Sequence, residues 1–216
     1  MSPSAFGYAI AALLCAAAAA VMIAYSLGRR AGKAASAGEN AALLSELSAQ
    51  ASLDALTGAY NRRRFDELSE RDIELSRRSL SSVAVVMIDI DWFKRVNDER
   101  GHSVGDQVLK MVTQACREAL RSSDILGRYG GEEFAVLLPG SGEEESLAVA
   151  ERLRERVEAK ALPCGGESVS VTVSLGVYSG VPSPGEGLDV YLRRADEALY
   201  RSKALGRNKT SYWKPL

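Results

Sequence analysis

The stretch that most limits how this chain can fold is "VAVVMIDID", residues 83–91. It begins as an uninterrupted apolar run rich in β-branched residues, a pattern that predicts a strand buried inside a sheet. The run ends in two acids, Asp89 and Asp91. We therefore expect a sheet-containing core that presents carboxylates at the end of a buried strand.

The remaining elements complete a recognisable order. They are a helix over 104–120, two strands around the Gly130-Gly131 turn of "ILGRYGGEEFAVLLP", a helix over 143–160, a strand over 168–180 and a helix over 188–205. The order is β-α-β-β-α-β with extra helices. It predicts an α+β fold, with an antiparallel sheet of the ferredoxin-like type backed by helices.

The N-terminus differs in composition from the rest of the chain. Residues 1–28 carry no charged side chain, and residues 5–27 are almost wholly apolar. As a helix this run would reach about 34 Å at about 1.5 Å per residue, which is enough to cross a bilayer. We expect a single transmembrane helix over 1–28. A secretory signal peptide and a buried soluble helix are the alternatives, although a signal peptide would carry basic residues before the apolar run.

The charges after this run predict its orientation. Arg29, Arg30 and Lys33 follow it, and no Lys or Arg precedes it. The positive-inside rule then places the rest of the chain in the cytoplasm, on the inner membrane. Residues 29–52 are expected to form a cytoplasmic linker that becomes helical, with an apolar stripe of Leu43, Leu47 and Ala51. This stripe could pair with a second copy or lie on its own domain, which we place at 53–216.

The overall composition excludes some functions. Lys plus Arg is 27 and Asp plus Glu is 28, a balance that gives no support for a nucleic-acid partner. The three cysteines, Cys15, Cys116 and Cys164, form no CxxC pair, so a zinc site is not expected. The single histidine, His102, more naturally supports a loop than a metal.

The acids suggest a different metal. In the predicted topology the end of the first strand lies beside the turn of the central hairpin, so Asp89 should meet Glu132 and Glu133. Acids brought together repel unless a cation joins them. Carboxylate oxygens favour Mg²⁺, with Mn²⁺ as the alternative, and Mg²⁺ held by few carboxylates commonly takes phosphates as further ligands. The pattern indicates a nucleoside triphosphate site, and a solvated acidic hairpin tip is the competing interpretation.

Five segments in order weigh against that alternative. They are "DALTGAYNRRRF" (54–65), "DIDWFKRVNDERGHSVGDQVL" (89–109), "RYGGEEF" (128–134), "SLGV" (174–177) and "ADEALYRSKALGRNK" (195–209). Together they resemble the GGDEF family of diguanylate cyclases over about residues 53–216. The resemblance implies an enzyme that joins two GTP molecules into cyclic di-GMP and releases two pyrophosphates.

The resemblance also implies roles for individual residues. The metal ligands would be Asp89, the carbonyl of Ile90 and Glu132, and Glu133 would help the 3′-hydroxyl proton leave. Guanine would be read by Asn97 and Asp106. Phosphates would be bound by Lys94, Lys203, Arg207 and the backbone amides of Trp92 and Phe93. In "RSSD" (121–124), Arg121 and Asp124 match an inhibitory site for the product cyclic di-GMP, where Arg121 can bond guanine in bidentate fashion.

One such domain would hold one GTP, so the resemblance implies a homodimer in which two substrates face each other. The membrane helix and the 39–53 stripe would promote this pairing. Three other readings remain open at this stage. The chain could be a non-catalytic receptor for GTP or cyclic di-GMP, a cyclase that makes a mixed cyclic GMP–AMP dinucleotide, or a structural membrane protein with an acidic hairpin.

Overall fold

The buried strand expected from the sequence is β2 (Val83–Ile90), a central strand of a six-stranded sheet in the computed structural model, which describes residues 52–215. The strand order is β1-β3-β4-β2-β7-β8. β2 pairs antiparallel with β4 (Glu133–Pro139) on one side and with β7 (Val173–Gly180) on the other. All of its residues are buried, which explains its uninterrupted apolar composition.

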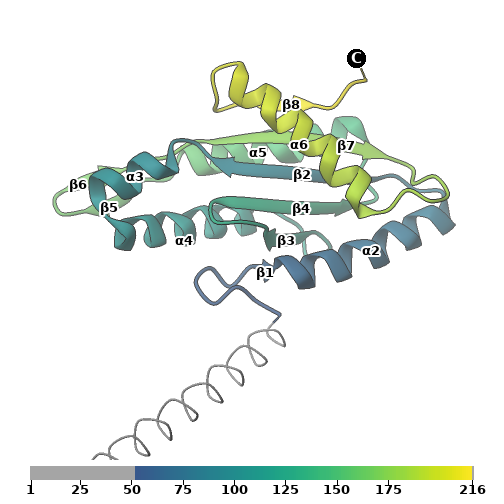
Figure 1. The fold of residues 1–216 in the computed structure, drawn as a ribbon, viewed down its shortest axis with the longest axis horizontal. Helices are drawn as coiled ribbons and strands as arrows, with labels where there is room; N and C mark the ends of the chain where they lie inside the picture. The colour runs from purple at the N-terminus through teal and green to yellow at the C-terminus, as the bar shows by residue number, and fades with distance from the viewer. Residues whose placement is uncertain (1–51, 216) are drawn as a thin grey trace, which may run out of the picture. The chain divides into compact units, whose positions relative to one another are not determined.

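The other described elements fill in around these three strands (Figure 1). They are β1 (Tyr60–Asn61), α2 (Arg62–Ser79), α3 (Phe93–Arg100), α4 (His102–Ala119), β3 (Ile125–Arg128), α5 (Glu143–Glu158), β5 (Leu162–Cys164), β6 (Glu167–Val169), α6 (Leu188–Ala204) and β8 (Thr210–Tyr212).

The predicted α+β topology is confirmed at the centre of the sheet. Strands β3, β4, β2 and β7 are antiparallel neighbours, and α4 and α5 provide the two helical connections. The sheet also has a parallel pair at each edge, β1 with β3 and β8 with β7, which the sequence did not predict. These edge strands are two and three residues long, too short to show an alternating pattern in the sequence.

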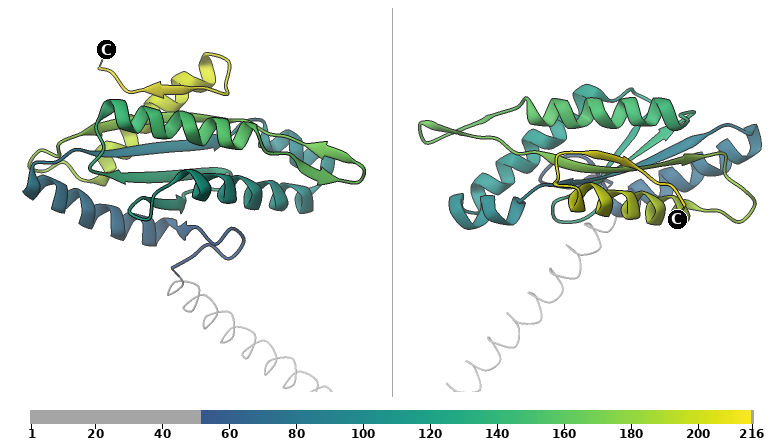
Figure 2. Two further views of the ribbon diagram at one scale, coloured as in Figure 1. Left: turned by 180° about the vertical axis from the view of Figure 1, so that it is seen from behind. Right: turned by 90° about the horizontal axis from the view of Figure 1, so that it is seen from above.

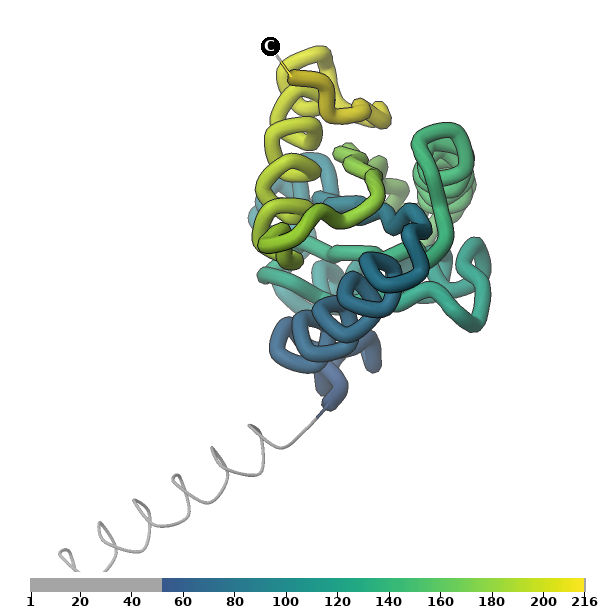
Figure 3. The backbone as a smooth tube through the Cα atoms, turned by 90° about the vertical axis from the view of Figure 1, so that its right-hand side faces the viewer, coloured from purple at the N-terminus to yellow at the C-terminus, as the bar shows by residue number. Residues whose placement is uncertain are grey.

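Helices cover both faces of the sheet. Helices α4 and α5 pack on the face that carries Ala84, Val86 and Ile88. Helices α2 and α6 pack on the opposite face, with Val85 and Met87. Figure 3, which looks along the sheet from its side, shows the two helical layers separated by the strands. The domain is therefore a three-layer sandwich, and side chains at the ends of β2 alternate between the two layers.

The strand predicted over 168–180 is interrupted. Residues 167–169 pair with 162–164 in the β5–β6 hairpin, and β7 begins only at Val173. Gly165 and Gly166 form the hairpin turn with φ of 57° and 90°. The alternating sequence gives no sign of this break, at which the pairing partner changes from β5 to β2. Figure 2 shows this hairpin projecting beyond the end of the sheet.

Helix α6 lies unusually close to β7. A Cβ atom added to Gly176 would lie 2.1 Å from the Ala195 carbonyl oxygen and 2.1 Å from the Leu199 amide nitrogen. No side chain fits there, so the glycine of "SLGV" allows the helix backbone to contact the strand directly.

Two predicted segments cannot be placed. The transmembrane helix over 1–28, and the linker over 29–52 except for its last residue, lie outside the described residues. Within residues 52–215, no helix is both long enough and apolar enough to span a membrane.

Candidate active site

The acids singled out in the sequence meet at one end of the sheet. Asp89 pairs in register with Glu133, the first residue of β4, so their side chains share the sheet face covered by α6. The amide of Ile90 donates to the carbonyl of Glu132 at 3.3 Å. The end of β2 and the hairpin turn are thus adjacent, as the topology predicted.

Ionisation of the carboxylates at this end of the sheet is unfavourable. Burial raises the pKa of Asp89 above its usual value, and the ammonium of Lys203, 2.8 Å from Asp89 Oδ2, opposes that rise without cancelling it. Burial also raises the pKa of Glu132, and the neighbouring Asp89 charge adds to the increase. Two partly buried acids whose ionisation is disfavoured form a site that a cation would stabilise.

The residues present fit a hard divalent cation. The available ligands are oxygens, namely the carboxylates of Asp89 and Glu132 and the carbonyl of Ile90, which suit Mg²⁺ or Mn²⁺. The ammonium of Lys203 already pairs with Asp89, which shows that a positive charge is electrostatically favourable at this position. Across residues 52–215 no cluster of three or more His, Cys, Asp or Glu side chains could by itself enclose a metal. Other oxygens, such as those of phosphate or water, would have to complete the coordination.

Arg128 bonds the Gly130–Gly131 turn to the start of the domain, a contact that the sequence analysis did not predict. Its Nε and Nη2 donate to the carbonyl of Gly131 at 3.2 and 2.7 Å, and its Nη1 donates to both carboxylate oxygens of Asp54 at 3.1 and 3.2 Å. Asp54 also accepts from the amide and hydroxyl of Thr57. Burial alone would raise the pKa of Asp54, but these hydrogen bonds outweigh it and lower the pKa. The start of the domain is therefore bonded to the turn that carries Glu132.

The predicted guanine readers come from adjacent helices. Asn97 is half-buried on α3 and Asp106 is exposed on α4. Gly105 makes their arrangement feasible, because a Cβ atom there would lie 2.0 Å from Asn97 Oδ1. Sequence reasoning missed Gly105. The available signal was a glycine within the predicted helical stretch, one residue before Asp106.

The predicted phosphate ligands lie around the start of α3 and the end of α6. Lys94 is exposed, Trp92 is 63% exposed, and the Phe93 side chain belongs to the core, so only its backbone can reach a ligand. The amides of Phe93 and Lys94 open α3 and have no intrahelical acceptor, which suits an anion. The guanidinium of Arg207 lies 3.8 Å from the Trp92 ring centroid.

The predicted inhibitory pair lies at a separate cavity. Arg121 and Asp124 line a space of about 370 Å³ together with Leu53, Gly58 and Arg117. The Arg121 amide donates to Asp124 at 2.8 Å, and the Arg117 guanidinium donates to the Gly58 carbonyl at 2.5 Å. The Arg121 side chain is exposed at the rim.

Fold and site together define an α+β domain in which paired acids, a lysine of α6 and a glycine turn meet at one end of the sheet. The profile of the family described as "Diguanylate cyclase, GGDEF domain" matches residues 51–209. The chain belongs to this family.

Individual relatives agree with this assignment. The chain is 39% identical over 165 residues to diguanylate cyclase DosC of Escherichia coli strain K12, across 75% of this chain and 35% of that relative. It therefore spans about a third of the length of that curated relative.

Two solved structures have the same fold. The GGDEF domain of DgcB from Caulobacter crescentus in complex with c-di-GMP matches with a TM-score of 0.71 and 33% identity, over 74% of this chain and 92% of that one. The active GGEEF domain of a diguanylate cyclase from Vibrio cholerae matches with a TM-score of 0.67 and 29% identity, over 72% of this chain and 100% of that one.

Proposed function

We propose that this protein is a diguanylate cyclase that condenses two GTP molecules into cyclic di-GMP and two pyrophosphates. The observation that carries the proposal is the meeting of Asp89, Glu132 and Lys203 at one end of the sheet. The similar domain from Vibrio cholerae, described as active, bears the same GGEEF signature that residues 130–134 form here.

The chain's own residues would bind and orient the triphosphate. Asp89, Glu132 and the Ile90 carbonyl would hold Mg²⁺ or Mn²⁺, which when bound polarises the α-phosphate and favours loss of the 3′-hydroxyl proton. Lys203 and Arg207 would bind phosphate oxygens, and Lys94 and the backbone amides of Trp92 and Phe93 would bind others. Glu133, on the same sheet face as Asp89, is the group we assign to accept the proton of the attacking hydroxyl.

Guanine selectivity would come from complementary hydrogen bonding. Asp106 can accept from the N1 and N2 groups of guanine, and the Asn97 amide can donate to O6. Adenine presents the opposite pattern and would leave these polar groups unpaired, which is costly.

The reaction needs two copies of the chain. Each domain supplies one set of ligands, while cyclic di-GMP contains two equivalent linkages, so two domains must face each other with their substrates antiparallel. We propose a homodimer for this reason. We also propose that residues 5–27 anchor the chain in the inner membrane with the catalytic domain in the cytoplasm, as their apolar composition and the cations that follow them indicate. Confinement to a membrane raises the effective concentration of the partners.

Product inhibition is the regulatory part of the proposal. The 370 Å³ cavity at Arg121 and Asp124 offers a guanidinium and a carboxylate, the groups that bond the two edges of guanine. The C. crescentus domain described in complex with c-di-GMP supports a dinucleotide ligand for this family.

A product assay tests the catalytic proposal. The full-length chain in detergent is incubated with GTP and Mg²⁺, with and without ATP, and the products are identified by mass spectrometry beside a pyrophosphate assay. The expected products are cyclic di-GMP and pyrophosphate from GTP alone. Nucleotide binding without pyrophosphate release would instead identify a receptor, and a mixed cyclic GMP–AMP product with ATP would identify the second type of cyclase.

A further inference from the structure

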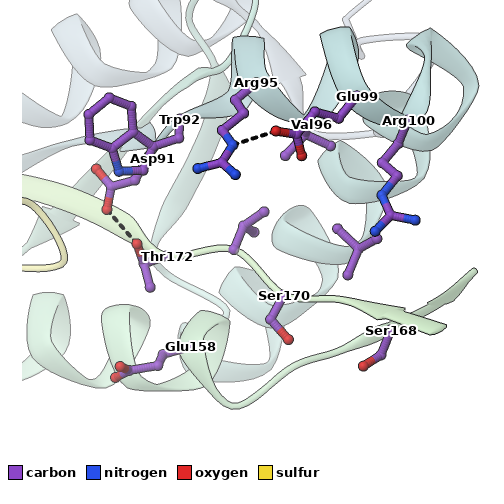
Figure 4. Close-up of a pocket in the computed structure, with 12 residues that line it drawn as sticks. Asp91, Trp92, Arg95, Val96, Glu99, Arg100, Glu158, Ser168, Ser170 and Thr172 are labelled. Carbon is purple, nitrogen blue, oxygen red and sulfur yellow. Dashed lines mark hydrogen bonds and ion pairs between the residues drawn. The ribbon is translucent and has the colours of Figure 1, made fainter.

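Asp91 is a buried carboxylate to which the proposed reaction assigns no role. It follows β2 directly and is 4% exposed. Its oxygens accept from the Thr172 hydroxyl at 2.7 Å, the Ser174 hydroxyl at 2.7 Å and the backbone amide of Asn208 at 3.0 Å. Figure 4 shows Asp91 bonded to Thr172 beside Trp92, at one end of a pocket of about 440 Å³. A buried acid needs such donors, but the third donor comes from a distant segment.

That segment is a turn with an unfavourable backbone conformation. Gly206, Arg207 and Asn208 have consecutive positive φ values of 107°, 63° and 45°. Two successive residues with side chains in the left-handed region persist only where surrounding contacts determine them. The Asn208 side chain supplies part of this support, accepting from Arg154 and donating to Glu158 of α5, each at 2.8 Å. The Gly206 and Arg207 amides donate to the Lys203 and Ser202 carbonyls at the end of α6, and Asp91 accepts from the next amide, that of Asn208.

The side chain of Arg207, in the same turn, contacts the residue that follows Asp91. The Arg207 guanidinium stacks on the Trp92 ring, 3.8 Å from its centroid. Guanidinium groups stack on aromatic faces and keep their N–H donors available in the ring plane. Asp91 and Trp92, which are adjacent in the sequence, therefore both position Arg207. Asp91 bonds the backbone amide of Asn208, the residue after Arg207, and Trp92 contacts the Arg207 guanidinium.

We propose that Asp91 is a positioning residue that acts through Arg207. By fixing the 206–208 turn it holds the guanidinium against Trp92 before nucleotide arrives, so that little conformational entropy is lost when phosphate binds. The inference rests on the proposed function for its ligand, the triphosphate. The position of Arg207 does not depend on that function, because it can be measured in the nucleotide-free protein.

Fluorescence tests the position of Arg207 directly. The chain has two tryptophans, so Trp213→Phe leaves Trp92 as the single reporter. In that background Asp91→Ala, which removes both acceptor oxygens, should increase quenching of Trp92 by the neutral quencher acrylamide, approaching the value for Arg207→Ala. Ser174→Ala is the matched control, because it removes a hydrogen bond to Asp91 but leaves the bond to Asn208. Quenching in Asp91→Ala no greater than in Ser174→Ala would overturn the proposal.

Affinity for a nonhydrolysable GTP analogue, measured by calorimetry, tests the consequence for binding. Asp91→Ala should weaken the affinity about tenfold. Asp91→Ala should have no further effect in an Arg207→Ala background, because both changes act on the same contact between Arg207 and phosphate. Additive losses, or unchanged affinity, would refute the coupling. If the wild-type chain binds no guanine nucleotide, the proposed function fails, and the quenching result alone decides whether Asp91 fixes the turn.

A measurement on the unaltered chain covers the case in which Asp91→Ala does not fold. The Asn208 amide should be protected from hydrogen exchange in the nucleotide-free protein to about the same degree as amides of β7. Rapid exchange at Asn208 would show that the bond to Asp91 does not hold the turn, and would refute the inference.

Discussion

The ammonium of Lys203 lies 2.8 Å from a carboxylate oxygen of Asp89, and the two side chains are 33% and 10% exposed. In the nucleotide-free protein a lysine assigned to phosphate therefore neutralises a carboxylate assigned to metal. The pairing does not remove the electrostatic cost of the site, because the pKa of Asp89 and that of Glu132 both stay raised. Removing one of these charges should therefore stabilise the fold.

Glu132→Gln should abolish turnover and stabilise the fold. The folded-state pKa of Glu132 lies above its ordinary value, so the folded protein favours the protonated form. The contribution of this group to stability is full below the ordinary pKa and is lost as the pH rises through the folded-state pKa. At pH 7 the uncharged glutamine should raise the Tm by about 1 to 4 °C, while cyclic di-GMP synthesis falls by at least about a hundredfold.

Thermal melts at pH 4 and pH 7, with a product assay, check this prediction. The gain in Tm should shrink at pH 4, where Glu132 itself is protonated. Glu155→Gln, at an exposed position of α5, is the control and should change neither quantity. Turnover at the wild-type rate in Glu132→Gln would show that Glu132 is not a metal ligand.

Gly105→Ala should weaken guanine recognition with little loss of stability. The added methyl group would lie 2.0 Å from Asn97 Oδ1, so the Asn97 amide must move while the helices keep their places. We expect KM for GTP to rise about tenfold, and discrimination against ATP to fall by a similar factor. Gly142→Ala is the control, since nothing lies within 4 Å of its Cβ position. Unaltered selectivity in Gly105→Ala would argue that Asn97 does not read the base.

Arg128→Lys should slow catalysis by releasing the turn. Lysine cannot bond the Gly131 carbonyl and both oxygens of Asp54 together, because it lacks the planar fork of arginine. We expect kcat to fall about tenfold and the Tm to fall by a few degrees. Asp54→Asn should act in the same direction, and the double variant should lose less than the sum. Arg95→Lys is the comparison, since its pair with Glu99 is 73% and 53% exposed. Strictly additive losses at Arg128 and Asp54 would contradict a shared role.

Arg121→Ala should relieve product inhibition. Its backbone amide, and not its side chain, bonds Asp124, so the substitution leaves that hydrogen bond in place. We expect the inhibition constant for cyclic di-GMP to rise at least about tenfold, measured against the variant's own uninhibited rate. Ser122→Ala lines the same cavity and serves as the control. An unchanged constant in Arg121→Ala would mean that product binds elsewhere.

The sequence predicted most of the long periodic segments, although it assigned no helix to the 18 residues of α2. β2 was recognisable because burial on both faces demands an apolar run, and α4 and α6 because each buries one continuous face. The edge strands β1 and β8 were not predicted, since they are defined by their partners and not by their own composition. The break before β7 was missed for the same reason.

The site divides along similar lines. Asp89 and Glu132 could be brought together from topology alone, because the end of a strand and the turn of its neighbouring hairpin share an edge. Arg128 and Asp54 could not, because 74 residues separate them and no periodicity links a loop to a strand end. The bond from Asp91 to the Asn208 amide was equally hidden, since a backbone donor leaves no mark in a sequence.

The direct contact between α6 and Gly176 limits how the activity of such a domain can be controlled. The helix that carries Lys203 contacts the strand beneath it with no side chain between them at Gly176. In the homodimer that we propose, moving α6 within one subunit would therefore be costly. The association of two such domains is then the step at which the rate would be controlled more readily.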